Sequence, residues 1–248
     1  MIINVDVKSL EWCSYLFLSQ DPVGIEEWHK VLNDPTQNDI HTSNQVAFSL
    51  PSRLIAKIFL FRWIYRGPAH AYAYDPDFNH ISKDTKFWQN VIDKYNHKYY
   101  NIYQKHLEYI NTVNLTGKLV SPFGRIHEYK LKKQRGVWSY SESDVTNHIN
   151  QGLGADLLTI IRVMAHQEVQ KLKKKTNLVC DFISTVHDSI VLDTPSENLP
   201  IVASLFDQIF RDIPRYVYKI FGVTWNIPMR CEIKYGPNMS DMEEYKCY

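Results

Sequence analysis

The chain has 248 residues, of which 44% are hydrophobic and 22% are charged, and its formal net charge is +1. This composition excludes extensive disorder and an overall basic character, although a local basic patch stays compatible with it. No signal peptide and no run of about 18 apolar residues occurs, so we expect a cytoplasmic chain with no membrane contact. Four irregularly spaced cysteines without a C-x-x-C pair favour reduced thiols.

Hydrophobic spacing and turn residues predict strands and helices without an internal repeat. In chain order the predicted elements are a strand at 2–7, helices at 9–19, 25–32 and 51–66, a helical stretch broken once at 84–113, a hairpin at 119–130, a helix at 143–174, a hairpin at 177–193, a helix from 200 to at least 210, and a strand at 228–233. Pro51 is expected to open its helix, since proline suits the first helical position. The order predicts an α+β fold and not a doubly wound sheet.

Two aspartates interrupt otherwise apolar strands, Asp6 in INVDV and Asp188 in TVHDSIV. A buried carboxylate is costly unless it is paired or bound to a cation. Two converging carboxylates supply the oxygen ligands that hard divalent cations take, and two such cations can assist in-line phosphoryl transfer. The alternative is that each acid caps a turn at the end of its strand.

A second pattern is a four-residue spacing in PSRLIAKIFLFRWIYRG, where Arg53, Lys57, Phe61 and Tyr65 follow one another. On a 3.6-residue helix these four positions fall within a stripe of roughly 120°. The two cations suit a triphosphate, and the two aromatic rings suit a sugar edge and a base plane. The alternative is an amphipathic helix with a solvated charged face and aromatic residues in the core.

Four segments in order resemble the motifs of family A (Pol I-like) DNA polymerases. DVKSLE at 6–11 resembles motif A, with Lys8 where that motif has Ser, and DIHT at 39–42 resembles its continuation. The Arg-Lys-Phe-Tyr stripe resembles motif B. VHD at 186–188 resembles motif C, and N-x-x-x-Q-G at 147–152 resembles the helix before it. The resemblance covers nearly the whole chain and is strongest to replicative polymerases of short-tailed phages.

The resemblance implies a complete set of site residues. The ligands of two Mg²⁺ ions would be Asp6, Asp188 and the Val7 carbonyl. The groups that bind the incoming dNTP would be Arg53, Lys57, His41, Glu11, Phe61 and Tyr65. The contacts with primer–template DNA would be His187, Gln151 and Asn147. Catalysis would rest on Asp6, Asp188 and Lys57, the last protonating the leaving pyrophosphate.

The resemblance also implies a right-hand polymerase architecture without a thumb. Residues 1–22 and 116–248 would form the palm, an antiparallel sheet with helices, and residues 23–115 would form the helical fingers. Because no thumb or exonuclease segment is recognisable, the chain is expected to be the C-terminal half of a split or truncated polymerase. A separate partner chain would then carry the thumb and the exonuclease.

Some residues depart from the family pattern. Arg66 stands where the family has Gly after the motif B tyrosine, and Ser189 stands where a Glu often follows the motif C aspartate. The alternatives are a single-subunit RNA polymerase-like enzyme and a non-catalytic DNA-binding polymerase remnant. Two basic runs, at 131–136 and 171–175, either contact phosphate or form solvated surface.

Overall fold

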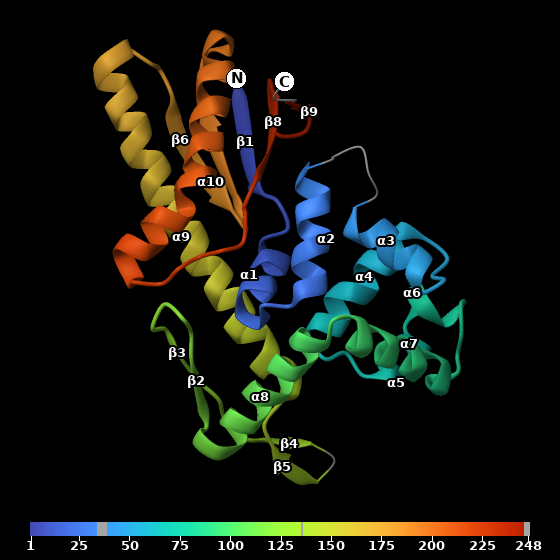
Figure 1. Ribbon diagram of the computed structural model, residues 1–248. Coiled ribbons are helices and arrows are strands. Elements are labelled where there is room, and N and C mark those ends of the chain that lie inside the picture. Colours follow the sequence, from blue (N-terminus) through green and yellow to red (C-terminus); the bar gives the residue numbers. More distant parts are fainter. Residues whose placement is uncertain (34–38, 135, 246–248) are drawn as a thin grey trace. The chain divides into compact units, whose positions relative to one another are not determined.

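The computed structural model describes residues 1–33, 39–134 and 136–245 (Figure 1). The chain forms two compact units, one of residues 1–14 with 152–248 and one of residues 15–151. Their boundaries fall inside helices α1 (Leu10–Ser19) and α9 (Glu142–Thr176). Residues 116–151, which the sequence placed with the palm, group with the helices of the second unit.

The first unit is built on an antiparallel sheet with strand order β6-β7-β1-β8-β9. The strands are β6 (Asp181–Val186), β7 (Ser189–Asp193), β1 (Ile2–Val7), β8 (Cys231–Gly236) and β9 (Glu243–Glu244). Central strand β1 alternates, with Ile3, Val5 and Val7 buried while Asn4 and Asp6 on the other face are only half-buried. Since successive side chains of a strand point to opposite faces, Asp6 lies on the polar face of the sheet.

Helices α9 and α10 (Leu199–Phe221) lie alongside the strands of this sheet (Figure 1). In α10, buried residues recur every three or four positions, among them Val202, Phe206, Ile209, Ile213 and Val217. This spacing gives the helix one apolar face, which it buries. The helix ends at Gly222, which adopts the left-handed conformation that glycine accepts without strain.

The second unit consists of helices and two short hairpins. The helices are α2 (Pro22–Asn33), α3 (Ile40–Ala47), α4 (Arg53–Ile64), α5 (Ala69–Tyr74), α6 (Pro76–Asn79), α7 (Thr85–Lys98) and α8 (Tyr100–Thr116). The hairpins are β2 (Lys118–Val120) with β3 (Ile126–Glu128), and β4 (Lys132–Gln134) with β5 (Val137–Ser139). Aromatic rings fill the core, where Phe59 of α4 stacks on Tyr72 at 4.6 Å and on Trp88 at 6.0 Å between ring centroids.

Most predicted elements are present, with corrections at their ends. The motif B helix begins at Arg53 and not at Pro51, because the Ser52 hydroxyl accepts the Ile55 N–H and caps it. The motif C hairpin begins at Asp181 and not at Asn177, whose left-handed φ of 54° follows the end of α9. The last strand begins at Cys231 and not at Pro228. The sequence did not predict α3 or the β4–β5 hairpin.

The sequence also predicted the absence of membrane-spanning segments and the presence of reduced cysteines, and both concern the described residues. Among them, no helix is long and apolar enough to cross a membrane. Cys13, Cys180 and Cys231 carry free thiols, and Cys247 lies outside the described residues.

Candidate active site

The turn between β6 and β7 holds Asp188 beside the end of β1. His187 and Asp188 form this two-residue turn, with His187 at a left-handed φ of 53°. The Val7 N–H donates to the Asp188 carbonyl at 3.2 Å, and Asp6 pairs in register with Ser189. The Ser189 hydroxyl donates to the Val186 carbonyl at 2.9 Å and closes the turn. The structure therefore brings the two predicted metal-binding aspartates to one end of the sheet.

A third carboxylate, that of Glu232, lies on the other side of Asp6. Glu232 on β8 pairs in register with Asp6. Burial, followed by the negative charges of Asp188 and Glu232, raises the pKa of Asp6 to about 6, although Lys234 acts in the opposite direction. Lys8 partly balances this charge, since its ammonium lies 3.4 Å from Glu232. The end of the sheet thus holds an excess of negative charge.

This donor set fits a divalent cation in its chemistry. Oxygen ligands suit Mg²⁺, and a bound cation would oppose the burial and the carboxylate repulsion that together raise the pKa of Asp6. In the described part of the chain, no group of three or more His, Cys, Asp or Glu residues is arranged to hold one metal ion. Two aspartates with a backbone carbonyl remain the proposed ligands.

Glu232 was missed at the sequence level, although a signal was present. Like Asp6, it is an acid on a strand next to a buried apolar residue, here Ile233 in CEIKYG. Its importance depends on the pairing of β8 with β1, which joins residues more than 220 positions apart in the chain. The sequence alone did not reveal that pairing.

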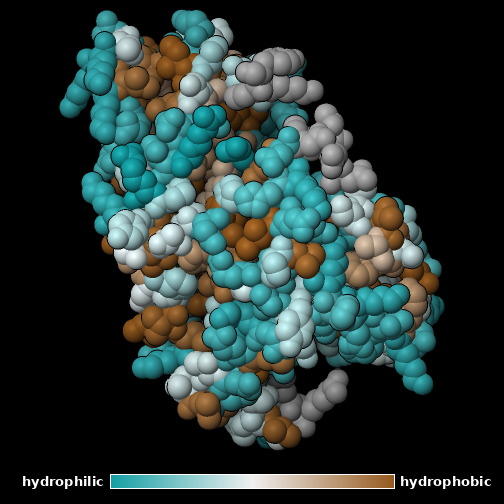
Figure 2. All heavy atoms as spheres, in the orientation of Figure 1, coloured by the Kyte–Doolittle hydropathy of each residue, from teal (hydrophilic) through white to brown (hydrophobic). Residues whose placement is uncertain are grey.

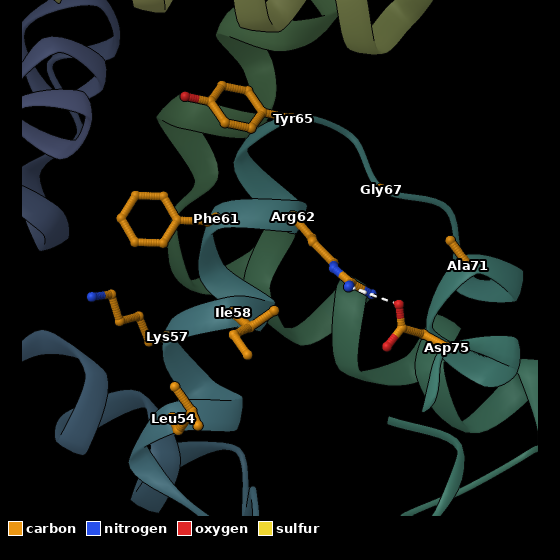
Figure 3. Close-up of a pocket in the computed structure, with 9 residues that line it drawn as sticks. All are labelled: Leu54, Lys57, Ile58, Phe61, Arg62, Tyr65, Gly67, Ala71 and Asp75. Carbon is orange, nitrogen blue, oxygen red and sulfur yellow. Dashed lines mark hydrogen bonds and ion pairs between the residues drawn. The ribbon is translucent and has the colours of Figure 1, made fainter. Parts of the chain in front are cut away.

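Helix α4 presents the predicted stripe on its outer face (Figure 3). Lys57 and Phe61 are not buried, whereas the opposite side of the helix buries Ile55, Ala56, Phe59, Leu60, Trp63 and Ile64. Tyr65 continues the stripe from the C-cap position, one residue past the helix. A cavity of about 640 Å³ opens beside this face, and it is lined by Leu54, Lys57, Ile58, Phe61, Arg62, Tyr65, Gly67, Ala71 and Asp75. The stripe is thus accessible to a ligand.

The two cations of the stripe differ in their surroundings. The Arg53 Nε donates to Asp39 at 2.8 Å, and the two side chains form an ion pair. Although burial raises it, hydrogen bonds from Arg53 and Thr42 lower the pKa of Asp39 to about 2. Lys57 has no ion-pair partner within the described residues and lies at the cavity. Of these two cations, Lys57 is the one whose charge is not paired in the described part of the chain.

His41 lies next to the stripe but is largely covered. Its ring centroid is 6.1 Å from that of Phe61. Burial lowers the pKa of His41 to about 4, against the influence of Asp39 and with that of Arg53 and Lys57. Its buried Nδ1 has no hydrogen-bond partner in the described residues. At neutral pH the ring is therefore uncharged and has an unused polar atom.

The N-terminal part of α9 carries the residues expected to touch DNA. Gln151 is exposed, and Asn147 is half-buried with an Oδ1 that lacks a hydrogen-bond partner among the described residues. The sequence missed the neighbouring Asn150, which is buried and donates to the Tyr65 hydroxyl at 3.4 Å. This amide holds the last residue of the stripe in place.

The remaining two predicted residues, Glu11 and His187, belong to the sheet unit. Glu11 lies in the first turn of α1, which follows β1. His187 is exposed at the tip of the β6–β7 turn.

Two arginines fix the C-terminal end of α4. Arg66 adopts a left-handed φ of 58° and pairs with Glu142 at 2.9 Å, and its guanidinium lies over the Tyr103 ring. Arg62 pairs with Asp75 at 2.8 Å across the cavity (Figure 3). A left-handed arginine is strained where glycine would not be, and these contacts offset that strain at position 66.

Comparisons with known proteins identify the relatives of this arrangement. Residues 2–241 match DNA polymerase family A. The chain is 26% identical, over 164 residues, to DNA polymerase I of Caldicellulosiruptor bescii, a match that covers 64% of this chain and 18% of that protein. Its fold is similar, at a TM-score of 0.74 and 16% identity, to a solved structure of the POL domain of Pol1 from M. smegmatis in complex with DNA primer-template and dNTP. That match covers 95% of this chain and 39% of the other, so this chain spans well under half of either relative.

Proposed function

This chain belongs to DNA polymerase family A, and we propose that it catalyses template-directed DNA synthesis by metal-dependent nucleotidyl transfer from a dNTP to a primer 3′-hydroxyl. The matched curated relative is named DNA polymerase I, and the matched structure holds primer-template and dNTP. The proposal carries these properties to a chain that spans only part of each relative.

The observation that supports this proposal most directly is the meeting of Asp6 and Asp188. They come from segments far apart in the chain and reach the same end of the sheet, where the pKa of Asp6 is raised to about 6. A protein gains no stability from placing like charges together, so a functional cause is the simpler explanation. The Mg²⁺ ligands would be Asp6, Asp188 and the Val7 carbonyl. Two bound Mg²⁺ ions would stabilise negative charge on the attacking and leaving oxygens.

The outer face of α4 would bind the nucleotide. Lys57 and Arg53 would contact the triphosphate, and Arg53 would exchange Asp39 for phosphate oxygens. His41, neutral at physiological pH, would donate a ring N–H to the triphosphate. As the bond to the α-phosphate breaks, Lys57 would donate a proton to the pyrophosphate. The remaining acceleration would come from holding the primer hydroxyl in line with the α-phosphate.

The aromatic residues and the α9 amides would position the remaining groups. Phe61 would pack on the deoxyribose and Tyr65 would lie near the template base. His187, Gln151 and Asn147 would contact the primer–template duplex, where minor-groove acceptors are shared by all base pairs. Such contacts suit an enzyme that copies any sequence.

The decisive experiment is primer extension by the purified chain, with and without Mg²⁺. Replacing Lys57 by Ala should lower the extension rate about 10²-fold or more, which is typical of a lost electrostatic group at a reaction centre. Lys94→Ala is the matched control, because it removes an exposed lysine of the same unit on α7. Extension that needs no metal, or a Lys57→Ala enzyme as fast as Lys94→Ala, would contradict the proposal.

Sugar selection separates this proposal from an RNA polymerase-like activity. Glu11 would occupy the space of a 2′-hydroxyl, so Glu11→Ala should raise ribonucleotide use relative to deoxyribonucleotide use about tenfold, the effect of an unpaired buried hydroxyl. Phe61→Tyr, which adds only a hydroxyl, should leave this ratio unchanged and favour dideoxynucleotides. Equal use of both sugars by the unmutated chain would support the RNA polymerase alternative instead.

A partner chain that carries a thumb and an exonuclease stays a prediction. With few groups to hold the duplex, the chain alone should extend primers weakly, and a second polypeptide that grips the duplex should increase both DNA affinity and extension. Rapid, processive synthesis by this chain alone would argue against such a partner.

A further inference from the structure

Residues 117–141, which include the β2–β3 and β4–β5 hairpins, are strongly basic. This segment contains six Lys and Arg residues and one Glu, a net of five positive charges, whereas the whole chain has a net charge of +1. It includes the whole predicted basic run at 131–136, of which Arg135 lies outside the described residues. This segment is therefore more positive than the chain as a whole, as is common in segments that contact phosphate.

The geometry of the β4–β5 hairpin separates its two faces. Lys132 forms an ion pair with Asp144 in the first turn of α9, so one face of the hairpin is directed at that helix. Lys133 is adjacent to Lys132 and pairs in register with Trp138 on β5. Since side chains alternate along a strand, Lys133 and Trp138 share the opposite face, which is directed away from α9.

This outward face presents a cation and an aromatic ring together. Trp138 is 63% exposed, and Lys133 is exposed without an ion-pair partner in the described residues. Figure 2 shows hydrophobic surface next to hydrophilic surface in the region where Figure 1 draws β4 and β5. Lys130 on the preceding loop is also exposed, while Lys118 faces Glu128 across the other hairpin. An indole so exposed buries little area in the folded chain, so packing does not explain it.

From this arrangement we propose that the outer face of the β4–β5 hairpin binds single-stranded DNA, with Trp138 stacking on a base and Lys133 and Lys130 contacting phosphates. The occupant is single-stranded because stacking on an exposed indole requires an open base face, which a duplex covers. Lysine is depleted at the centres of protein–protein interfaces, so unpaired lysines around the ring favour a polyanion over a protein partner. Stacking is tolerant of sequence, so any unpaired strand would bind.

The test is the binding of fluorescein-labelled oligo(dT) to the full chain by anisotropy, without metal or dNTP and over a range of salt concentrations. Trp138→Ala should weaken binding about tenfold, the usual effect of losing one stacked base. Trp138→Phe should restore most of the affinity. Lys133→Gln should reduce the slope of log affinity against log salt by about 0.7, the value for one phosphate contact on a single strand.

Two controls separate stacking from general effects. Val137→Ala changes a neighbour that is 67% exposed on the other face, and it should bind within about twofold of the unmutated chain. An abasic oligomer keeps the phosphates and removes the bases, so Trp138→Ala and the unmutated chain should bind it equally.

Three results would overturn the proposal. The first is an equal loss of affinity for Trp138→Ala and Val137→Ala. The second is a loss by Trp138→Ala for the abasic oligomer that equals its loss for oligo(dT). The third is unchanged affinity in every variant, which would mean that the single strand does not bind at this hairpin. The assay needs no catalysis, so it succeeds or fails separately from the proposed polymerase activity.

Discussion

The carboxylate end of the sheet and the cationic stripe of α4 shift the pKa of an aspartate in opposite directions. At the sheet, burial and two neighbouring carboxylates raise the pKa of Asp6 to about 6. Beside α4, contacts with Arg53 and Thr42 bring the pKa of Asp39 down to about 2, in spite of its burial. Burial raises both pKa values, but the carboxylates beside Asp6 add to that effect, whereas the hydrogen bonds to Asp39 reverse it.

The carboxylates around Asp6 are therefore arranged to accept a cation directly. Arg53, in contrast, would first have to give up its ion pair with Asp39. Like charges at Asp6 raise the free energy of the metal-free protein, and a cation would remove that cost. Arg53 is already paired with Asp39, so in the proposed site a triphosphate would have to displace Asp39 to contact the arginine.

The largest effect is expected from loss of the sheet carboxylates. Asp6→Ala or Asp188→Ala should reduce primer extension by at least about 10²–10³-fold, because each change removes a proposed metal ligand. Asp181→Asn is the control, since it neutralises an exposed carboxylate of the same hairpin on β6. Extension by either alanine variant at a tenth of the normal rate would remove that aspartate from the catalytic role.

The second prediction concerns stability in EDTA. Because folding raises the pKa of Asp6 from 3.8 to about 6, the aspartate lowers stability as its carboxyl ionises, and stability is lost as the pH rises through about 6. Asp6→Asn should therefore be more stable than the unmutated chain by about 1–2 kcal/mol at pH 8, a figure reduced for solvent screening of a half-exposed group. Below pH 4 the two should be equally stable.

Urea unfolding at both pH values measures this difference. Addition of Mg²⁺ at pH 8 should stabilise the unmutated chain and reduce the advantage of Asp6→Asn. An asparagine variant that is less stable at pH 8 would show that Asp6 is a structural carboxylate.

The smallest effect is expected at Asp39. Asp39→Asn keeps a side chain that can cap α3 but removes the ion pair with Arg53, so Arg53 becomes available to the triphosphate. The KM for dNTP should fall about two- to fivefold, as expected from an exposed ion pair of about 0.5–1 kcal/mol. Asp84→Asn, at the N-cap of α7, is the matched control. An unchanged or raised KM would mean that Asp39 helps Arg53 to bind nucleotide.

The elements that local pattern defines were predicted well. The strand at 2–7 matches its predicted bounds, and the helical stretch from 84 to 113 is broken once, at Tyr99 between α7 and α8. The outward stripe of α4 also followed from the sequence, because a four-residue spacing fixes a helix face whatever the helix packs against.

Contacts between distant segments were not predictable in this way. The sequence showed that Asp6 and Asp188 each interrupt a strand, and the family resemblance joined them, but it did not reveal Glu232 opposite Asp6. It also did not reveal that Asn150 donates to Tyr65 or that Arg66 pairs with Glu142. Each of these contacts joins residues at least 76 positions apart, where no local periodicity operates.

Local patterns were thus enough to predict the chemical groups, their order and most of the secondary structure that carries them, because spacing and side-chain type act locally. The tertiary structure decided which charges meet. The register of β1 between β7 and β8 placed Asp6 among carboxylates, and the packing of α3 against α4 gave Arg53 its aspartate. A pKa depends on distance in space and on burial, and both are fixed only when the chain has folded.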